Sequence, residues 1–480
     1  FSMAYHANLA MQIYSLESSF CYRDFARSSR LCLEELKKAG AENVELIPHK
    51  ADGETTYGDF IMPEAWDVDE ASLEVVEPAG APAPVLADLK KHPFAVANRC
   101  ASTPEQGVVA EVVTLDEARR RKRLDGKLVF VQDTSPRYVR GMVLEKNGIG
   151  IISAYSGAKD APDGILWING WCTGSGWYHT KEDKKLLCFS ITPRIGEVLQ
   201  SLLKSSRSVH VRARVRSRIY AGEISTVTGL LPGRSDEEIL FVAHLYEPML
   251  TDNATSVAAL IEACRVLNRL LREGSIPPLK RGIRFLFSME RYGVAAFFEK
   301  RRENIRAALN VDSITPDITR TGMMHLSLCN NPYSNPFFGD FIFEHLLEHC
   351  FPPEIAWRRE RPEFGDDSFI ADSSIGIPTN YFMSHPGKLH HSSLEAEVVD
   401  WNLGREMAVV MTTYAYLLAA GEEANAGLLE AISYSSTKSE LLSFFQTLAN
   451  ALTSKPGALT AEEAEERAAW FTAYLKKKLS

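Results

Sequence analysis

Residues 239–262 read Ile-Leu-Phe-Val-Ala-His-Leu-Tyr-Glu-Pro-Met-Leu-Thr-Asp-Asn-Ala-Thr-Ser-Val-Ala-Ala-Leu-Ile-Glu. The first five residues are apolar and predict a buried strand. The helical spacing of apolar residues later in the stretch predicts a long amphipathic helix over 254–272. His244 and Asp252 stand between the two elements. A strand, a polar loop and a helix in this order are typical of a parallel sheet covered by helices.

The same alternation extends outward along the chain. Strands are predicted at 224–231, 239–243, 283–287, 307–311 and 379–383, and helices at 254–272, 295–302, 336–350 and 402–420. One further helix is expected over 4–40, with Gly40 as its stop. We therefore predict an α/β fold in which a three-layer, mixed and mostly parallel sheet lies between helices.

Residues 105–220 contain their own succession of strands and helices, which predicts an α/β domain inserted into a larger one. The larger domain would comprise residues 1–104 and 221–425. Residues 426–480 read as a C-terminal helical tail with a lysine-rich end and no recognisable chemistry.

Composition excludes some partners. The chain has 480 residues, a net charge of -9 and a pI of about 5.8. An acidic protein is unsuited to nucleic acid, which needs a basic face, and no apolar run is long enough to span a membrane. The eight cysteines form no CxxC pair, which favours reduced thiols over disulfides. We expect a cytoplasmic protein, and a homo-oligomer stays open.

Polar residues that can bind metals follow several predicted strands. His244, Glu290 and Asp312 each come directly or almost directly after a strand. The carboxyl ends of parallel strands meet at one edge of a sheet, where ligands bind. Asp252 precedes the long helix and could equally be its cap. The pair His390-His391 is a further candidate.

Zinc explains why these residue types belong together. It takes imidazole nitrogens and carboxylate oxygens, and catalytic sites keep one position open for water. A carboxylate between two metals can bridge them, and an unligated glutamate can accept a proton from the activated water. A single histidine after a strand is more often structural, but several such residues in order favour a metal site.

The segments that carry these residues resemble, in order, the motifs of the family-twenty-eight metallopeptidases. They are Phe241–Pro248 with Thr251–Glu262, Arg284–Gly293, Leu309–Asp312, and Ile375–Pro378 with His391–Glu395. The resemblance is greatest to uncharacterised bacterial aminopeptidase-like proteins. Residues 105–220 look like the protease-associated domain that such peptidases often carry.

The resemblance implies a role for each matching residue. Asp252 would bridge two zinc ions, His244 and Asp312 would complete one position, and His391 would serve the other. Glu290 would be the general base. The implied activity is that of a zinc aminopeptidase acting on a peptide or small amide substrate.

Departures from the family's pattern affect the second zinc position. Tyr246 replaces an acid that orients the first histidine, and Ser256 replaces a glycine. Arg291 stands where the family has a second ligating glutamate, and a guanidinium cannot bind zinc. The site is therefore expected to hold one or two zinc ions, and whether Glu247 substitutes as a ligand stays open. The resemblance also places Asp366, Asp367 and His390 near the pocket, although an exposed loop is an equal alternative for the two aspartates.

Other readings of the sequence remain open. His345-Leu-Leu-Glu-His349 fits the HxxEH zinc motif, but its helix also has the apolar residues of an ordinary core helix. The same fold could serve an acyltransferase such as a glutaminyl cyclase, or a hydrolase of non-peptide amides. A catalytically inactive, metal-poor binding protein is a third alternative.

Overall fold

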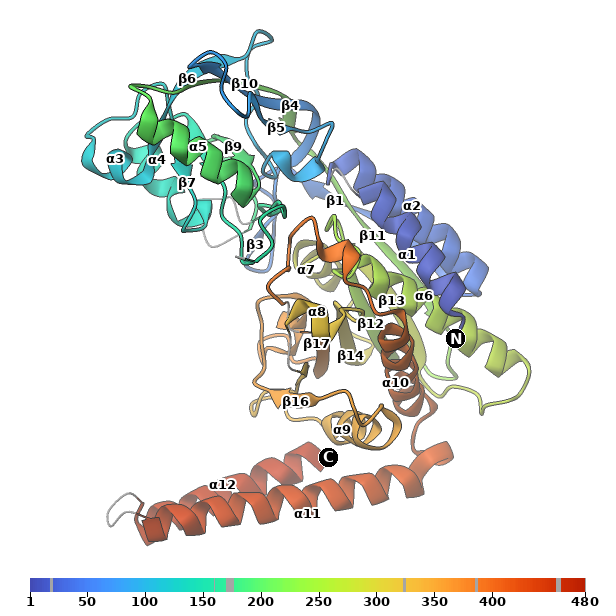
Figure 1. The fold of residues 1–480 in the computed structure, drawn as a ribbon. Helices are drawn as coiled ribbons and strands as arrows, with labels where there is room; N and C mark the ends of the chain where they lie inside the picture. Colours follow the sequence, from blue (N-terminus) through green and yellow to red (C-terminus); the bar gives the residue numbers. More distant parts are fainter. Residues whose placement is uncertain are drawn as a thin grey trace.

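The computed structural model describes residues 1–17, 20–158, 160–169, 177–322, 325–384, 387–454 and 459–479. Figure 1 shows its main parts: a large sheet with its helices, a second sheet with shorter helices, and a pair of long helices at the C-terminus. The first part contains the candidate site.

The large sheet has eight strands in the order β1-β11-β13-β12-β14-β17-β15-β16. Their bounds are Glu42–Ala51 (β1), Gly222–Leu231 (β11), Gly282–Met289 (β13), Glu238–Leu245 (β12), Ile305–Asp312 (β14), Thr379–Ser384 (β17), Leu326–Cys329 (β15) and Trp357–Glu360 (β16). Strands β13, β12, β14 and β17 are mutually parallel, whereas β1, β11 and β15 add antiparallel pairs. The predicted mixed sheet is confirmed, and the carboxyl ends of its central strands share one edge.

Helices cover both faces of this sheet. Strand β12 shows why: Phe241 belongs to the main apolar core on one face, and Val242 belongs to a smaller apolar cluster on the other. The main core includes α1 (Met3–Glu17), α2 (Tyr22–Ala39), α6 (Ala254–Arg272), α9 (Gly339–Cys350) and α10 (Trp401–Ala420), and the smaller cluster includes α7 (Tyr292–Phe298) and the 3-10 turn η3 (Asp367–Ala371). The three-layer arrangement follows from this alternation of buried side chains.

The N-terminal helix predicted over 4–40 is wrong in one respect, because the structure has two helices, α1 and α2. Phe20 and Cys21 lie between them and belong to the core of the second sheet rather than to the main core. The predicted stop is confirmed: Gly40 has φ 92° and ends α2 in the left-handed conformation.

The second sheet has seven strands in the order β5-β4-β10-β6-β7-β8-β9. Their bounds are Val85–Asp88 (β5), Ala65–Glu77 (β4), His210–Tyr220 (β10), Val108–Thr114 (β6), Lys127–Val131 (β7), Gly150–Ser153 (β8) and Leu187–Ser190 (β9). Helices α3 (Leu115–Arg120), α4 (Arg140–Glu145) and α5 (Pro193–Ser205) accompany these strands. We call residues 65–220 the inserted unit.

The inserted unit starts earlier than the sequence suggests. Strand β4 pairs with β10 from Ala65 opposite Tyr220 to Glu77 opposite His210, so residues 65–104 belong with the second sheet and not with the first. The boundary expected between 104 and 105 is therefore wrong. Pairing between strands so distant in the sequence leaves no local signal.

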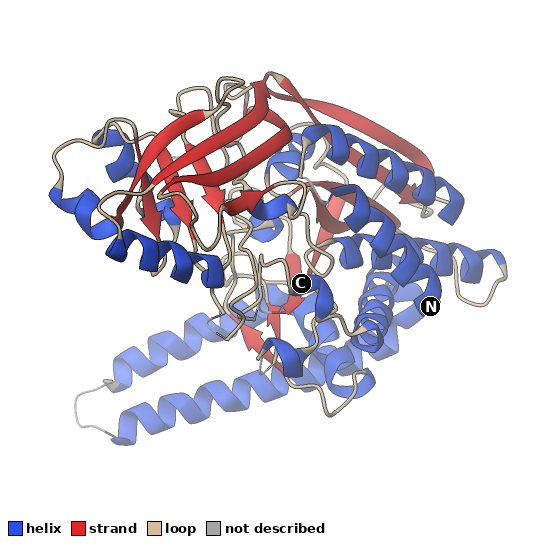
Figure 2. Cartoon of the chain, turned by 45° about the horizontal axis from the view of Figure 1, so that its top comes forward, coloured by secondary structure: helices blue, strands red, loops and turns tan. Residues whose placement is uncertain are grey.

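The C-terminal tail is helical, as expected, and consists of α11 (Glu422–Ser454) and α12 (Ala461–Leu479). The two helices run side by side, away from the sheets, in both views (Figures 1 and 2). Buried Lys478 anchors the tail, with its ammonium 3.3 Å from both Asp340 on α9 and Glu440 on α11. Within the described residues, no helix combines the length and apolar composition needed to cross a membrane.

The remaining elements are short. They are β2 (Thr56–Tyr57), β3 (Phe60–Ile61), α8 (Ile318–Thr321), η1 (Pro93–Ala95), η2 (Pro136–Tyr138) and η4 (Glu395–Glu397). The cysteines that the structure describes, which exclude Cys172, form no disulfide with one another.

Candidate metal centre

His244 lies at the carboxyl end of β12 and is buried. Its Nε2 is 3.0 Å from Asp252 Oδ1, and its Nδ1 is 3.2 Å from the side-chain amide nitrogen of Asn253. The amide of Asn253 also donates to the carbonyl of Val311. Asn253 therefore orients the ring of His244 so that Nε2 faces the carboxylate of Asp252. In the family this orienting role belongs to an acid at the position of Tyr246.

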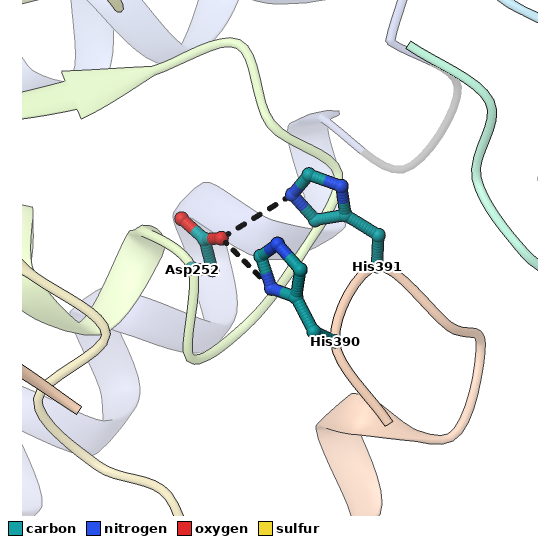
Figure 3. A group of neighbouring side chains, drawn as sticks. All are labelled: Asp252, His390 and His391. Atoms are coloured by element: carbon teal, nitrogen blue, oxygen red, sulfur yellow. Dashed lines mark ion pairs between the residues drawn. The ribbon is translucent and has the colours of Figure 1, made fainter. Parts of the chain in front are cut away.

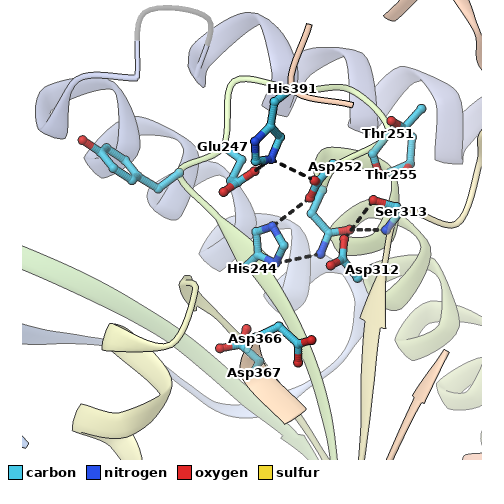
Figure 4. Close-up of polar contacts among 12 residues, drawn as sticks. His244, Glu247, Thr251, Asp252, Thr255, Asp312, Ser313, Asp366, Asp367 and His391 are labelled. Atoms are coloured by element: carbon cyan, nitrogen blue, oxygen red, sulfur yellow. Dashed lines mark hydrogen bonds and ion pairs between the residues drawn. The ribbon is translucent and has the colours of Figure 1, made fainter. Parts of the chain in front are cut away.

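Asp252 is the centre of the site. Its Oδ1 faces His244, and its Oδ2 lies 3.4 Å from His391 Nε2 and 3.6 Å from His390 Nδ1 (Figures 3 and 4). Burial opposes ionisation, yet the contacts with His244 and His391 hold the pKa of Asp252 well below its usual range. The alternative reading of Asp252 as a helix cap is wrong, because Asn253 occupies the N-cap of α6.

Glu247 joins the site from the loop after β12. Its Oε2 lies 3.1 Å from His391 Nε2, and its side chain is buried (Figure 4). Donor atoms of His244, Glu247 and Asp252 all lie within 4.8 Å of one another, and so do those of Asp252, His390 and His391. The two groups share Asp252.

Asp312 is held beside this cluster at the end of β14 (Figure 4). The hydroxyl of Tyr381 donates to its Oδ2 at 2.8 Å, and the hydroxyl of Ser313 donates to its Oδ1 at 3.0 Å. Burial raises the pKa of Asp312 well above its usual range, and the charge of Asp252 adds to the rise. Asp312 thus adjoins the two compact groups without belonging to either.

Glu290 follows β13 at the same edge of the sheet and is buried. Burial raises its pKa well above its usual range, and the charges of Glu247 and Asp367 add to this, whereas His244 opposes it. A buried carboxylate among other acids is costly to ionise unless a cation is near.

Arg291 turns away from the metal-binding side chains. Its backbone has φ 61°, and its N–H donates to Asp367 Oδ1 at 2.6 Å. Its guanidinium carbon lies 5.0 Å from the ring centroids of both Phe60 and Trp177. The guanidinium of Arg291 therefore stacks on aromatic rings.

Asp366 and Asp367 are buried in the loop that starts η3, so the exposed-loop alternative is wrong. Asp366 Oδ1 accepts from the backbone N–H of Ser368 and the amide of Asn310. Burial raises the pKa of Asp366 to about 6 and that of Asp367 to about 7. Both carboxyl groups lie below His244 in Figure 4.

The inserted unit positions His391. The backbone N–H of Trp167 donates to the carbonyl of His391 at 2.7 Å, and the two rings meet edge-on with centroids 5.0 Å apart. Residues 165 and 393 also exchange hydrogen bonds. The sequence does not indicate this contact of Trp167 with His391, because it joins two distant parts of the chain.

Glu395 ties the two ligand-bearing loops together. Its Oε1 accepts hydrogen bonds from the hydroxyl of Thr251 and from the backbone N–H of Asp252. Its Oε2 accepts a hydrogen bond from the backbone N–H of His391. Burial raises the pKa of Glu395 to about 8. The family motif includes this position, but the sequence did not indicate its bridging contacts.

The HxxEH alternative finds no support. His345 and His349 stack on each other with ring centroids 4.1 Å apart on α9, and His349 is exposed. Among the described residues, neither histidine belongs to a group able to hold a metal ion.

A large cavity of about 1430 Å³ is lined by residues of both the inserted unit and the main domain. Arg291 and Tyr292, the two residues after Glu290, line it together with Phe60, Tyr178 and Phe369. Neither Glu290 nor the candidate metal ligands line the cavity.

The turn after Glu290 is tightly packed at Gly293. A methyl group there would lie 1.7 Å from Ser288 Oγ, which is fixed by hydrogen bonds to Thr226 and Ser225. We expect Gly293→Ala to lower the free energy of unfolding by about 1–3 kcal/mol, measured by urea titration. Gly427→Ala, on α11 with open space around it, is the matched control and should unfold at or slightly above the native midpoint. Equal midpoints for both variants would show that the turn adapts.

Solved structures of peptidases share this architecture. The chain superposes on the zinc aminopeptidase BSAP from Bacillus subtilis with a TM-score of 0.59 and 13% identity, covering 86% of this chain and 96% of that one. It superposes on a Peptidase M28 precursor from Shewanella amazonensis with a TM-score of 0.58 and 15% identity, covering 88% and 98%. The fold is thus a zinc-peptidase fold.

The sequence comparison points to the same family. Residues 226–326 match the family model of peptidase family M28, a range that contains His244, Asp252, Glu290 and Asp312. None of the curated proteins matches the sequence. The resemblance to family-twenty-eight metallopeptidases is therefore confirmed.

Proposed function

We propose that this protein is a zinc-dependent aminopeptidase that removes N-terminal residues from peptides. The observation that carries the proposal is the convergence of His244, His391 and Glu247 on Asp252, next to buried Glu290. These groups lie at the carboxyl edge of parallel strands, where α/β proteins bind their ligands.

The donor set fits zinc. Imidazole nitrogens and carboxylate oxygens are zinc ligands, and the buried carboxyl groups of Glu290 and Asp312 have raised pKa values that a divalent cation would relieve. His244, Asp252 and Asp312 would hold one ion. When bound, zinc supplies Lewis acidity, which lowers the pKa of a water molecule and polarises the amide carbonyl.

Glu290 is the proposed base. A carboxylate oxygen of Glu290 takes a proton from the attacking water as the water oxygen bonds to the carbonyl carbon. The same group then gives that proton to the leaving nitrogen when the C–N bond breaks. The cavity lined in part by Arg291 and Tyr292 would hold the rest of the peptide.

The proposal is tested by turnover of aminoacyl anilides by the zinc-loaded protein. Release of the aniline from substrates with a free amino group, but not from their N-acetylated counterparts, is the expected result. Equal turnover of both would indicate a general amidohydrolase. Transfer of the acyl group without release of a free amino acid would indicate an acyltransferase, and no turnover despite full zinc loading would favour a binding protein.

A further inference from the structure

Arg291 stands where the family has a second ligating glutamate, so another residue would have to supply that ligand for a second zinc ion to bind. On that side Asp252 Oδ2 lies 3.4 Å from His391 Nε2 and 3.6 Å from His390 Nδ1. The side chain of His390 is 36% exposed, whereas those of His391 and Asp252 are 17% and 6% exposed. Neither histidine replaces the lost carboxylate, and catalytic zinc sites usually have three protein donors. The guanidinium of Arg291 lies over Phe60 and Trp177 and supplies nothing there.

We infer that Glu247 has taken over as the missing ligand and completes a second zinc position with Asp252 and His391. The inference rests on the proposed function, since it concerns the same metal centre. The ligating carboxylate would then come from the loop after β12, which contains Glu247, and not from the loop after β13, which contains Arg291.

The geometry of Glu247 supports a ligand more than a structural ion pair. Its side chain is 3% exposed, and its Oε2 makes no well-aligned hydrogen bond with any residue that the structure describes, although His391 Nε2 is only 3.1 Å away. An ion pair that only oriented His391 would be expected to align an N–H with the oxygen. Two donor atoms that lie close without such a bond can instead face a common point, as the ligands of one ion do.

The surroundings hold this carboxylate in place. Pro248 follows Glu247 directly, and the loop then returns to Asp252. On the other side, Glu395 accepts from the backbone N–H groups of both Asp252 and His391. The three proposed donors therefore belong to two loops joined by a buried carboxylate, which fixes their spacing before an ion arrives.

The test is zinc content by inductively coupled plasma mass spectrometry, after loading and dialysis of the full-length protein. The native protein should retain about two zinc ions, Glu247→Gln about one, and Glu247→His about two, because imidazole also binds zinc. Histidine at 247 would repel His391 if position 247 served only as its ion-pair partner, so this variant separates the two roles. Glu273→Gln, an exposed carboxylate at the end of α6, is the matched control and should behave as native.

The measured zinc contents distinguish failure of the Glu247 inference from failure of the proposed function. Two ions in Glu247→Gln, or a single ion in native protein that Glu247→Gln also retains, would overturn the role of Glu247 while leaving the proposed function standing. No zinc in the native protein would overturn both. Circular dichroism of each variant checks that it is folded, and a folded Glu247→His that retains only one ion would also overturn the inference.

Discussion

Glu290→Gln is expected to lower kcat on an aminoacyl anilide by about a hundredfold to ten-thousandfold, the usual worth of a positioned base. This corresponds to about 3–5 kcal/mol of transition-state stabilisation at 1.36 kcal/mol per tenfold. Glutamine keeps the shape of the buried side chain but cannot accept a proton from water. Because Glu290 is not among the proposed ligands, zinc content should stay as in the native protein.

Two further variants serve as comparisons for Glu290→Gln. His244→Ala should lose zinc and activity together, since it removes a donor at the end of β12. Glu273→Gln changes an exposed glutamate in the same way and should keep native kcat. Near-native turnover by Glu290→Gln would mean that the base lies elsewhere.

Asp252→Asn is expected to have the largest effect on metal binding. The two oxygens of Asp252 face different partners, His244 on one side and His391 with His390 on the other. Asparagine replaces one oxygen by an amide nitrogen, which has no free lone pair for a metal, and removes the negative charge. Zinc content should fall from about two ions to less than one per chain, with loss of activity.

Asp366→Asn is the matched control for Asp252→Asn. Asp366 is also a buried aspartate near the site, but its oxygen is used by Ser368 and Asn310. This variant should retain native zinc content. Equal zinc content in Asp252→Asn and native protein would show that Asp252 does not hold the metals.

Much of the metal centre could be predicted from the sequence because its residues follow strands whose apolar character is locally readable. His244 and Asp312 lie at the carboxyl ends of β12 and β14, Glu290 directly follows β13, and parallel pairing of these strands brings their ends together. The loop residue Asp252 could not be separated from a helix cap by spacing alone. Its contacts with His244 and His391 separate the two readings.

What could not be predicted depends on contacts between distant segments. The pairing of β4 with β10 moved the start of the inserted unit to residue 65. The contact of Trp167 with His391 made that unit part of the site's support. The direction of the Arg291 side chain depends on a backbone with positive φ and on the ring of Phe60, and the sequence around Arg291 predicts neither.

Anomalous diffraction at the zinc absorption edge, from crystals of the zinc-loaded protein, would locate the ions that Asp252 is proposed to hold. The predicted result is two peaks on either side of the Asp252 carboxylate, one toward His244 and Asp312 and the other toward His391 and Glu247, each about 2.0–2.2 Å from its ligand atoms. A zinc-loaded crystal without a peak at Asp252, or with its peak at another group such as His345 and His349, would show that Asp252 does not hold zinc.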